Sequence, residues 1–154
     1  MLSRRFLASA VLLLASANAW AADFRSVGTP AVLYDGPSHK GSKLYIAPRG
    51  MPVEVILSYG EWVKVRDFSG DMAWTEAKLL SPRRTVIVRN AGVRVRSTPD
   101  ESGSALMAAD RGLLLELVEA PADPSAAPQA AAWVKVRHED GIIGYIKAID
   151  IWGI

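Results

Sequence analysis

The chain carries one stretch of sequence twice, and this duplication limits the possible folds more than any other feature. When the 154-residue sequence is shifted by 62 positions, residues 33–56 align without a gap on residues 95–118. A shift of 71 positions places residues 62–66 on residues 133–137, with five identities in a row, Trp-Val-Lys-Val-Arg. The chain is therefore predicted to fold as two copies of one unit of about 58 residues, too small to bury much surface alone. We expect the two copies to touch and to stabilise each other.

The difference between the two shifts places a nine-residue insertion in the second copy. The inserted stretch, at about residues 120–132, consists largely of alanine and proline. Such a composition cannot bury a core, so a mobile surface loop is predicted there.

Both copies show the alternation that is typical of β-strands. In the first copy Val53, Val55 and Leu57 occupy alternate positions, as do Val63 and Val65 further on. Side chains at alternate positions share one face of a strand, so these residues are predicted to form the core. Residues 113–118 could be helical by propensity, but the equivalent residues 51–56 contain proline and β-branched residues and could not. The fold class is therefore predicted to be all-β. Only for residues 42–47 and 104–109 does the pattern allow either a strand or a short helical turn.

The first 21 residues are typical of an export signal. A short basic start containing Arg4 and Arg5 precedes an apolar run over residues 6–17 and a small-residue cleavage pattern ending at Ala21. This predicts a Sec-type signal peptide, a periplasmic or secreted protein, and no membrane span in the mature chain. Removing the signal leaves basic and acidic residues equal in number, which argues against a nucleic-acid partner.

The residue types present favour binding over catalysis. The chain has no cysteine and only two histidines, His39 and His138, so neither a thiolate nor a clustered histidine metal site is expected. No common nucleophile, metalloprotease or phosphate-loop motif occurs, and no cofactor is expected.

Tryptophans and arginines are the candidate binding residues. Trp62 and Trp133 are predicted to lie opposite the core valines, where each ring either anchors a ligand, or closes the end of its unit or packs at the contact between the copies. Arg94 and Arg96 should point to the same side of a strand, either to bind an anion or to pair with Glu116, Asp100 or Glu101.

The order of motifs resembles the bacterial SH3-like family. Four segments of the second copy show this resemblance. They are Gly-Val-Arg-Val-Arg-Ser-Thr-Pro at 92–99, Arg111-Gly112, the Trp-Val-Lys-Val-Arg strand at 133–137, and Gly144-Tyr145-Ile146 after Asp140-Gly141. The first copy diverges, since it lacks the arginine of the opening motif and has Ala73-Trp74-Thr75 in place of glycine, aromatic and aliphatic. The resemblance implies two tandem small β-barrels, at residues 22–81 and 82–154, after the signal peptide.

The same resemblance implies a function in recognition. It suggests a non-enzymatic exported module that binds peptidoglycan fragments or an envelope protein, with a structural or assembly adaptor as the alternative. A small hydrolase is a third hypothesis. The candidate ligand-binding residues are Trp62, Trp133, Trp74, Tyr145, Arg94 and Arg96.

Overall fold

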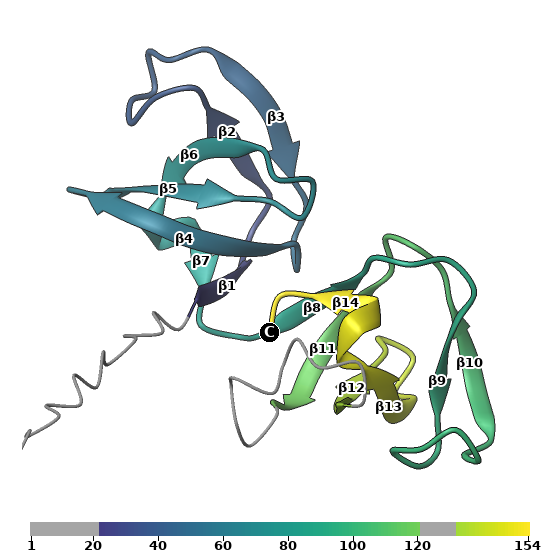
Figure 1. Cartoon of the computed structure of the whole chain (residues 1–154). Coiled ribbons are helices and arrows are strands. Elements are labelled where there is room, and N and C mark those ends of the chain that lie inside the picture. The colour runs from purple at the N-terminus through teal and green to yellow at the C-terminus, as the bar shows by residue number, and fades with distance from the viewer. Residues whose placement is uncertain (1–21, 121–131) are drawn as a thin grey trace, which may run out of the picture.

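The computed structural model describes residues 22–120 and 132–154 and is built from β-strands (Figure 1). The predicted signal peptide at 1–21, and most of the predicted loop at 120–132, lie outside the described residues. Among the described residues, no helix has the length and apolar character needed to cross a bilayer.

The first copy forms one antiparallel sheet of seven strands, in the order β3-β2-β6-β5-β4-β1-β7. A short 3-10 helix, η1 (Ala77–Leu79), separates the last two strands. The strands are β1 (Asp23–Val27), β2 (Ala31–Tyr34), β3 (Lys43–Ala47), β4 (Pro52–Tyr59), β5 (Trp62–Arg66), β6 (Met72–Glu76) and β7 (Leu80–Ser81).

The second copy repeats this topology strand for strand, in the order β10-β9-β13-β12-β11-β8-β14. Its 3-10 helix, η3 (Ala148–Asp150), again precedes the last strand. The strands are β8 (Thr85–Val88), β9 (Val93–Arg96), β10 (Ala105–Ala109), β11 (Leu114–Glu119), β12 (Trp133–Arg137), β13 (Ile143–Lys147) and β14 (Ile151–Trp152).

The two sequence shifts map one set of strands onto the other. A shift of 62 carries β2 onto β9 and β3 onto β10, and a shift of 71 carries β5 onto β12 and β6 onto β13. The predicted duplication and all-β class are confirmed. Residues 42–47 and 104–109, which the sequence left open, form the strands β3 and β10. The proposed boundary between residues 81 and 82 stays a prediction.

The prediction of closed barrels is wrong in one respect, because each sheet is open. Within the described residues the end strands β3 and β7 do not pair with each other, nor do β10 and β14. Strand β7 has two residues, and both pair with β1. So short a strand has few backbone groups with which to close the ring.

Each sheet curls around its own aliphatic core, as the strand alternation predicts. Val53, Val63 and Val65 are buried in the first copy, and Val134 and Val136 are buried in the second. Leu57 is an exception, with 44% of its surface exposed. A β-bulge interrupts the pairing of β4 with β5 after Val55, so Leu57 lies opposite Lys64 on the outer face. The predicted core position of Leu57 is therefore wrong.

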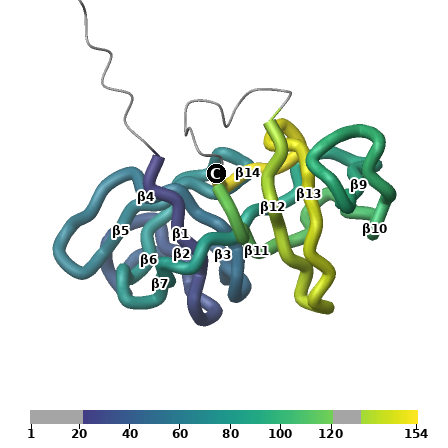
Figure 2. The backbone as a smooth tube through the Cα atoms, turned by 90° about the horizontal axis from the view of Figure 1, so that it is seen from below, coloured from purple at the N-terminus to yellow at the C-terminus, as the bar shows by residue number. Residues whose placement is uncertain are grey.

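The two copies lie side by side and are in contact, as expected for units of this size (Figure 2). The ring of Phe24 in β1 packs edge-on against Trp152 in β14, with 5.0 Å between centroids. The guanidinium of Arg84 lies 5.8 Å from the centre of the Phe24 ring and donates a hydrogen bond to the Gly153 carbonyl at 2.9 Å. The Phe24 ring of the first copy therefore contacts both an aromatic ring and a guanidinium of the second copy.

Candidate functional site

In the second copy, a tryptophan lies beside two cations and one acid. Trp133 begins β12, and the Lys147 Nζ atom of β13 lies 5.7 Å from the centre of its ring. Lys147 also forms an ion pair with Glu101, which follows β9. Arg96 of β9 contacts the same acid, with 3.5 Å between Nη2 and Oε2, and donates to the Gly103 carbonyl at 2.8 Å. We call Arg96, Glu101, Trp133 and Lys147 the charged face.

The charged face borders a cavity of about 240 Å³. Arg94 lies on its wall beside Arg96, because both point away from the buried Val93 and Val95 on β9. Asp150 also lines the cavity, and its carboxylate accepts a hydrogen bond from Asn90 at 2.9 Å. Among the described residues, Arg94 makes no ion pair, so its guanidinium remains available to an anionic ligand.

The electrostatics of the charged face keep its acid ionised. The hydrogen bond from Lys147 lowers the pKa of Glu101 below its usual value, against the opposing effect of desolvation, and the charges of Lys147 and Arg96 add to the lowering. Three cations against two carboxylates line the cavity and leave an excess of positive charge at neutral pH. A carboxylate of a ligand is therefore favoured there.

In the first copy, the equivalent positions carry aromatic side chains. The ring of Trp62 packs at steep angles against Tyr34, at 5.6 Å between centroids, and against His39, at 4.9 Å. The His39 Nε2 atom lies 3.0 Å from the Glu76 carboxylate at the end of β6. We call Tyr34, His39, Trp62 and Glu76 the aromatic face.

Glu76 is the charged centre of the aromatic face. Partial desolvation would raise the pKa of its carboxyl, but a hydrogen bond from Lys78 and the positive charge of that lysine outweigh it, and His39 adds to the net lowering. Lys78 Nζ lies 3.2 Å from the Glu76 carboxylate. The acid is therefore already paired, and the aromatic face offers rings more than charge.

The two faces occupy the same place in the fold. The shift of 62 carries Tyr34 onto Arg96 and His39 onto Glu101, while the shift of 71 carries Trp62 onto Trp133 and Glu76 onto Lys147. Only the tryptophan is retained. One scaffold therefore presents two surfaces of different chemistry, aromatic in the first copy and cationic in the second.

The six candidate residues from the sequence fall into separate groups. Arg94, Arg96 and Trp133 come together at one cavity. Trp62 belongs to the aromatic face, and both tryptophans are half-buried. Trp74 lies opposite Tyr34 in the register of β6 with β2, and Tyr145 lies opposite Arg96, but neither lines the cavity. Whether any of the six binds a ligand stays a prediction.

Sequence reasoning missed the partners of the tryptophans. Tyr34 and His39 of the first copy, and Glu101 and Lys147 of the second, lie outside the strands that the tryptophans begin, and no local motif connects them to the rings. A signal was nevertheless present, because the shift of 62 aligns Tyr34 with Arg96 and His39 with Glu101, and the shift of 71 aligns Glu76 with Lys147.

The arginines divide between the two expected roles. Arg83 pairs with Glu116 at 2.8 Å and Arg96 contacts Glu101, as expected for charges paired on a surface. Arg94 lies on a cavity wall without such a partner among the described residues. Within residues 22–120 and 132–154 there is no group of three or more metal-ligating side chains.

The fold and these faces define a tandem pair of small all-β modules, each presenting a half-buried tryptophan on its surface. A family model described as bacterial SH3 domain matches residues 27–82 and again residues 89–153. The chain therefore belongs to the bacterial SH3 domain family and contains two copies of the domain, which confirms the predicted resemblance.

Several solved structures are similar to the chain. NlpC2 from Trichomonas vaginalis shares 12% identity over 86% of this chain and 48% of that one, with a TM-score of 0.37. NlpC1 from the same organism shares 13% identity over 96% of this chain and 51% of that one, with a TM-score of 0.39. An NlpC/P60 family protein from Bacillus cereus shares 13% identity over 84% and 56%, with a TM-score of 0.37. This chain spans about half the length of these proteins, and no curated protein matches its sequence.

Proposed function

We propose that this protein is a non-enzymatic binding module of the bacterial cell envelope and that its charged face binds peptidoglycan fragments. The observation that carries the proposal is the grouping of Trp133 with Arg94, Arg96 and Lys147 around one open cavity. A half-buried indole can stack on a sugar ring or an apolar peptide group. The guanidinium beside it can bind a carboxylate of the stem peptide.

The proposal includes export to the periplasm or the outside of the cell. The support is the basic, apolar and small-residue pattern of residues 1–21. Mass spectrometry of the protein recovered from the periplasm should give a chain that begins at Ala22. An intact N-terminus in that fraction would contradict the predicted cleavage.

Co-sedimentation with purified peptidoglycan sacculi tests the binding. Trp133→Ala should weaken binding by about 2 kcal/mol or more, roughly thirtyfold, because the ligand loses the half-buried ring on which it stacks. Trp62→Ala is the matched control, since it removes the same ring from the other copy and leaves the cationic cavity intact. A melting temperature measured for both variants separates lost binding from lost folding.

Two results would contradict the proposal. Wild-type protein that remains in the supernatant with sacculi would exclude peptidoglycan as the ligand. A Trp133→Ala variant that melts far below the wild type would show that the ring serves the core.

The alternative function, an adaptor that docks onto an envelope protein, also has support in the fold. Large apolar side chains are exposed near the ends of β3 and β4, with Ile46 and Tyr59 at 68% and 67% exposure. A stoichiometric protein partner in pull-downs from envelope extract, lost on Ile46→Asp and accompanied by no binding to sacculi, would favour this second function.

A further inference from the structure

A second cavity lies between the two copies, and neither Trp62 nor Trp133 lines it. Its volume is about 520 Å³, which is within the range of sites that hold small ligands. The first copy contributes Ser26, Gly28, Arg49 and Gly50 to its walls, among others, and the second contributes Glu116 and Arg137. Neither copy forms this cavity alone, so it arises from their arrangement. We call it the inter-copy cleft.

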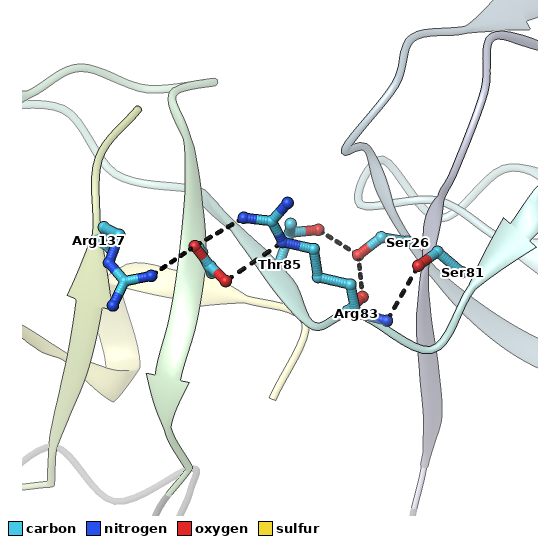
Figure 3. A network of polar contacts seen from close by, with 6 residues as sticks. Ser26, Ser81, Arg83, Thr85 and Arg137 are labelled. Carbon is cyan, nitrogen blue, oxygen red and sulfur yellow. Dashed lines mark hydrogen bonds and ion pairs between the residues drawn. The ribbon is translucent and has the colours of Figure 1, made fainter. Parts of the chain in front are cut away.

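Hydrogen bonds fix the two walls of the inter-copy cleft relative to each other (Figure 3). The buried Ser26 hydroxyl donates to the Arg83 carbonyl at 2.6 Å and lies 2.6 Å from the Thr85 hydroxyl. The Thr85 hydroxyl donates to the Gly50 carbonyl at 2.7 Å. These contacts link β1, the turn before β4, and β8, so the cleft is preorganised before any ligand enters.

Three arginines line the inter-copy cleft, and two of them share one acid. The Arg83 guanidinium binds both oxygens of Glu116, at 3.2 and 2.8 Å, and Arg137 approaches the same carboxylate at 3.4 Å (Figure 3). The hydrogen bond from Arg83 is the main cause that lowers the pKa of Glu116 below its usual value, so the acid stays ionised. In the first copy the equivalent acid, Glu54, pairs with Arg66 alone among the residues that the structure describes.

The third arginine, Arg49, leaves positive charge unbalanced. Among the described residues it has no carboxylate within ion-pair distance, although it lies on the wall of the cleft. Glu139 is the other acid on the wall, and His138 contacts Asp140 at 3.2 Å. With three arginines and two glutamates, the lining has one cation in excess at neutral pH.

We propose that the inter-copy cleft binds a ligand that carries a single carboxylate, such as the C-terminus of a short peptide, and that Arg49 is its main anchor. A guanidinium matches the planar geometry of a carboxylate and can bind both of its oxygens. Glu116 and Glu139 disfavour a dianion such as phosphate, because they would repel its second charge. The amides of Gly28 and Gly50 already donate to the Leu79 and Val27 carbonyls, so these glycines contribute space without a side chain, and Leu114 contributes an apolar surface for the ligand. This proposal does not depend on the charged face or its ligand.

Titration of the isotope-labelled chain with N-acetyl-alanyl-alanine, followed by amide NMR spectra, tests this site. We expect the Gly28 and Gly50 amide signals to shift with a dissociation constant in the micromolar to millimolar range. The C-terminal amide of the same dipeptide should bind at least tenfold more weakly, and so should inorganic phosphate. The Trp133 indole signal reports the charged face in the same spectra, so binding at that face is read separately from binding in the inter-copy cleft, and failure at one site is distinguishable from failure at the other.

Arg49→Gln should weaken the dipeptide at least tenfold while the spectrum keeps its folded dispersion. The matched control is Arg111→Gln, because Arg111 is the equivalent residue of the second copy and packs over the Phe68 ring, outside the cleft. That variant should bind as the wild type does. Unmoved Gly28 and Gly50 signals at millimolar dipeptide, equal binding of the amide, tighter binding of phosphate, or equal losses in the two variants would each overturn the proposal.

Discussion

Gly144→Ala is a sharp test of the packing beneath the charged face. Gly144 is a buried residue of β13, next to Tyr145, and lies against β9. A methyl group added there would lie 2.6 Å from the Arg96 carbonyl oxygen and 2.6 Å from the Val95 side chain. Both distances are about 0.8 Å shorter than ordinary van der Waals contact. Because one of the two atoms belongs to the backbone of β9, that strand must move.

The expected cost is large for a unit of this size. Overpacking of a well-filled core costs about 1–3 kcal/mol, and two simultaneous clashes place this variant near the upper end. A domain of about 60 residues has a free energy of unfolding of roughly 3–9 kcal/mol. The substitution should therefore remove a substantial share of the stability of the second copy and displace Arg96 from the charged face.

Urea unfolding followed by tryptophan fluorescence measures the effect. With a slope of about 1.5 kcal/mol/M, a loss of about 2–3 kcal/mol lowers the midpoint by roughly 1.3–2 M. The matched control is Ala73→Gly, because Ala73 is the equivalent residue of the first copy and already carries the methyl group. Its loss should cost only about 1 kcal/mol. A midpoint for Gly144→Ala within about 0.3 M of the wild type would refute the packing described here.

Three further predictions follow from the polar contacts. Thr85→Val removes the donor to the Gly50 carbonyl and should cost about 1–2 kcal/mol, or roughly 4–8 °C in calorimetry. The Thr75 hydroxyl lies 3.4 Å from its acceptor, the Val32 carbonyl, so the control variant Thr75→Val should cost less. Equal shifts in melting temperature for the two variants would contradict the role of Thr85. The hydrogen bond from Arg83 lowers the pKa of Glu116 in the folded state. The ionised Glu116 therefore stabilises the fold fully above its unfolded pKa of about 4.5, and this stabilisation is lost as the pH falls through the folded pKa. The acid side of the urea-midpoint profile should flatten in Glu116→Gln, and an unchanged profile would argue against this linkage. The pKa of the Tyr45 phenol is raised, mainly by burial and next by the hydrogen bond that its hydroxyl donates to Asp67. Alkaline absorbance titration should show a late tyrosine step that Tyr45→Phe abolishes; its persistence would assign it to another residue.

The sequence predicted the strands well because their signals are local or repeated. Alternating valines in β5 and β12 mark the buried face, and the proline near the start of β4 excludes a helix there and, by equivalence, in β11. The same local reasoning failed at Leu57, because a bulge reverses the alternation and depends on pairing with β5. It also failed on barrel closure, which depends on whether the two end strands meet.

For the candidate sites, the sequence supplied residues without their neighbours. It placed Trp133 and Trp62 at equivalent positions and Arg94 beside Arg96 on one strand face. It gave no reason to group Lys147 and Glu101 with Trp133, since these residues come from β13 and from the turn after β9.

The amino-acid order alone thus determined the duplication, the all-β class and the alternation of core and surface, because these follow from side chains a few residues apart or from comparison of the two copies. Only the tertiary structure decided the chemistry of the two faces and the existence of the inter-copy cleft. Each of these surfaces is assembled from strands and turns distant in sequence, and the contact between the copies depends on how two folded units pack, which no local pattern encodes.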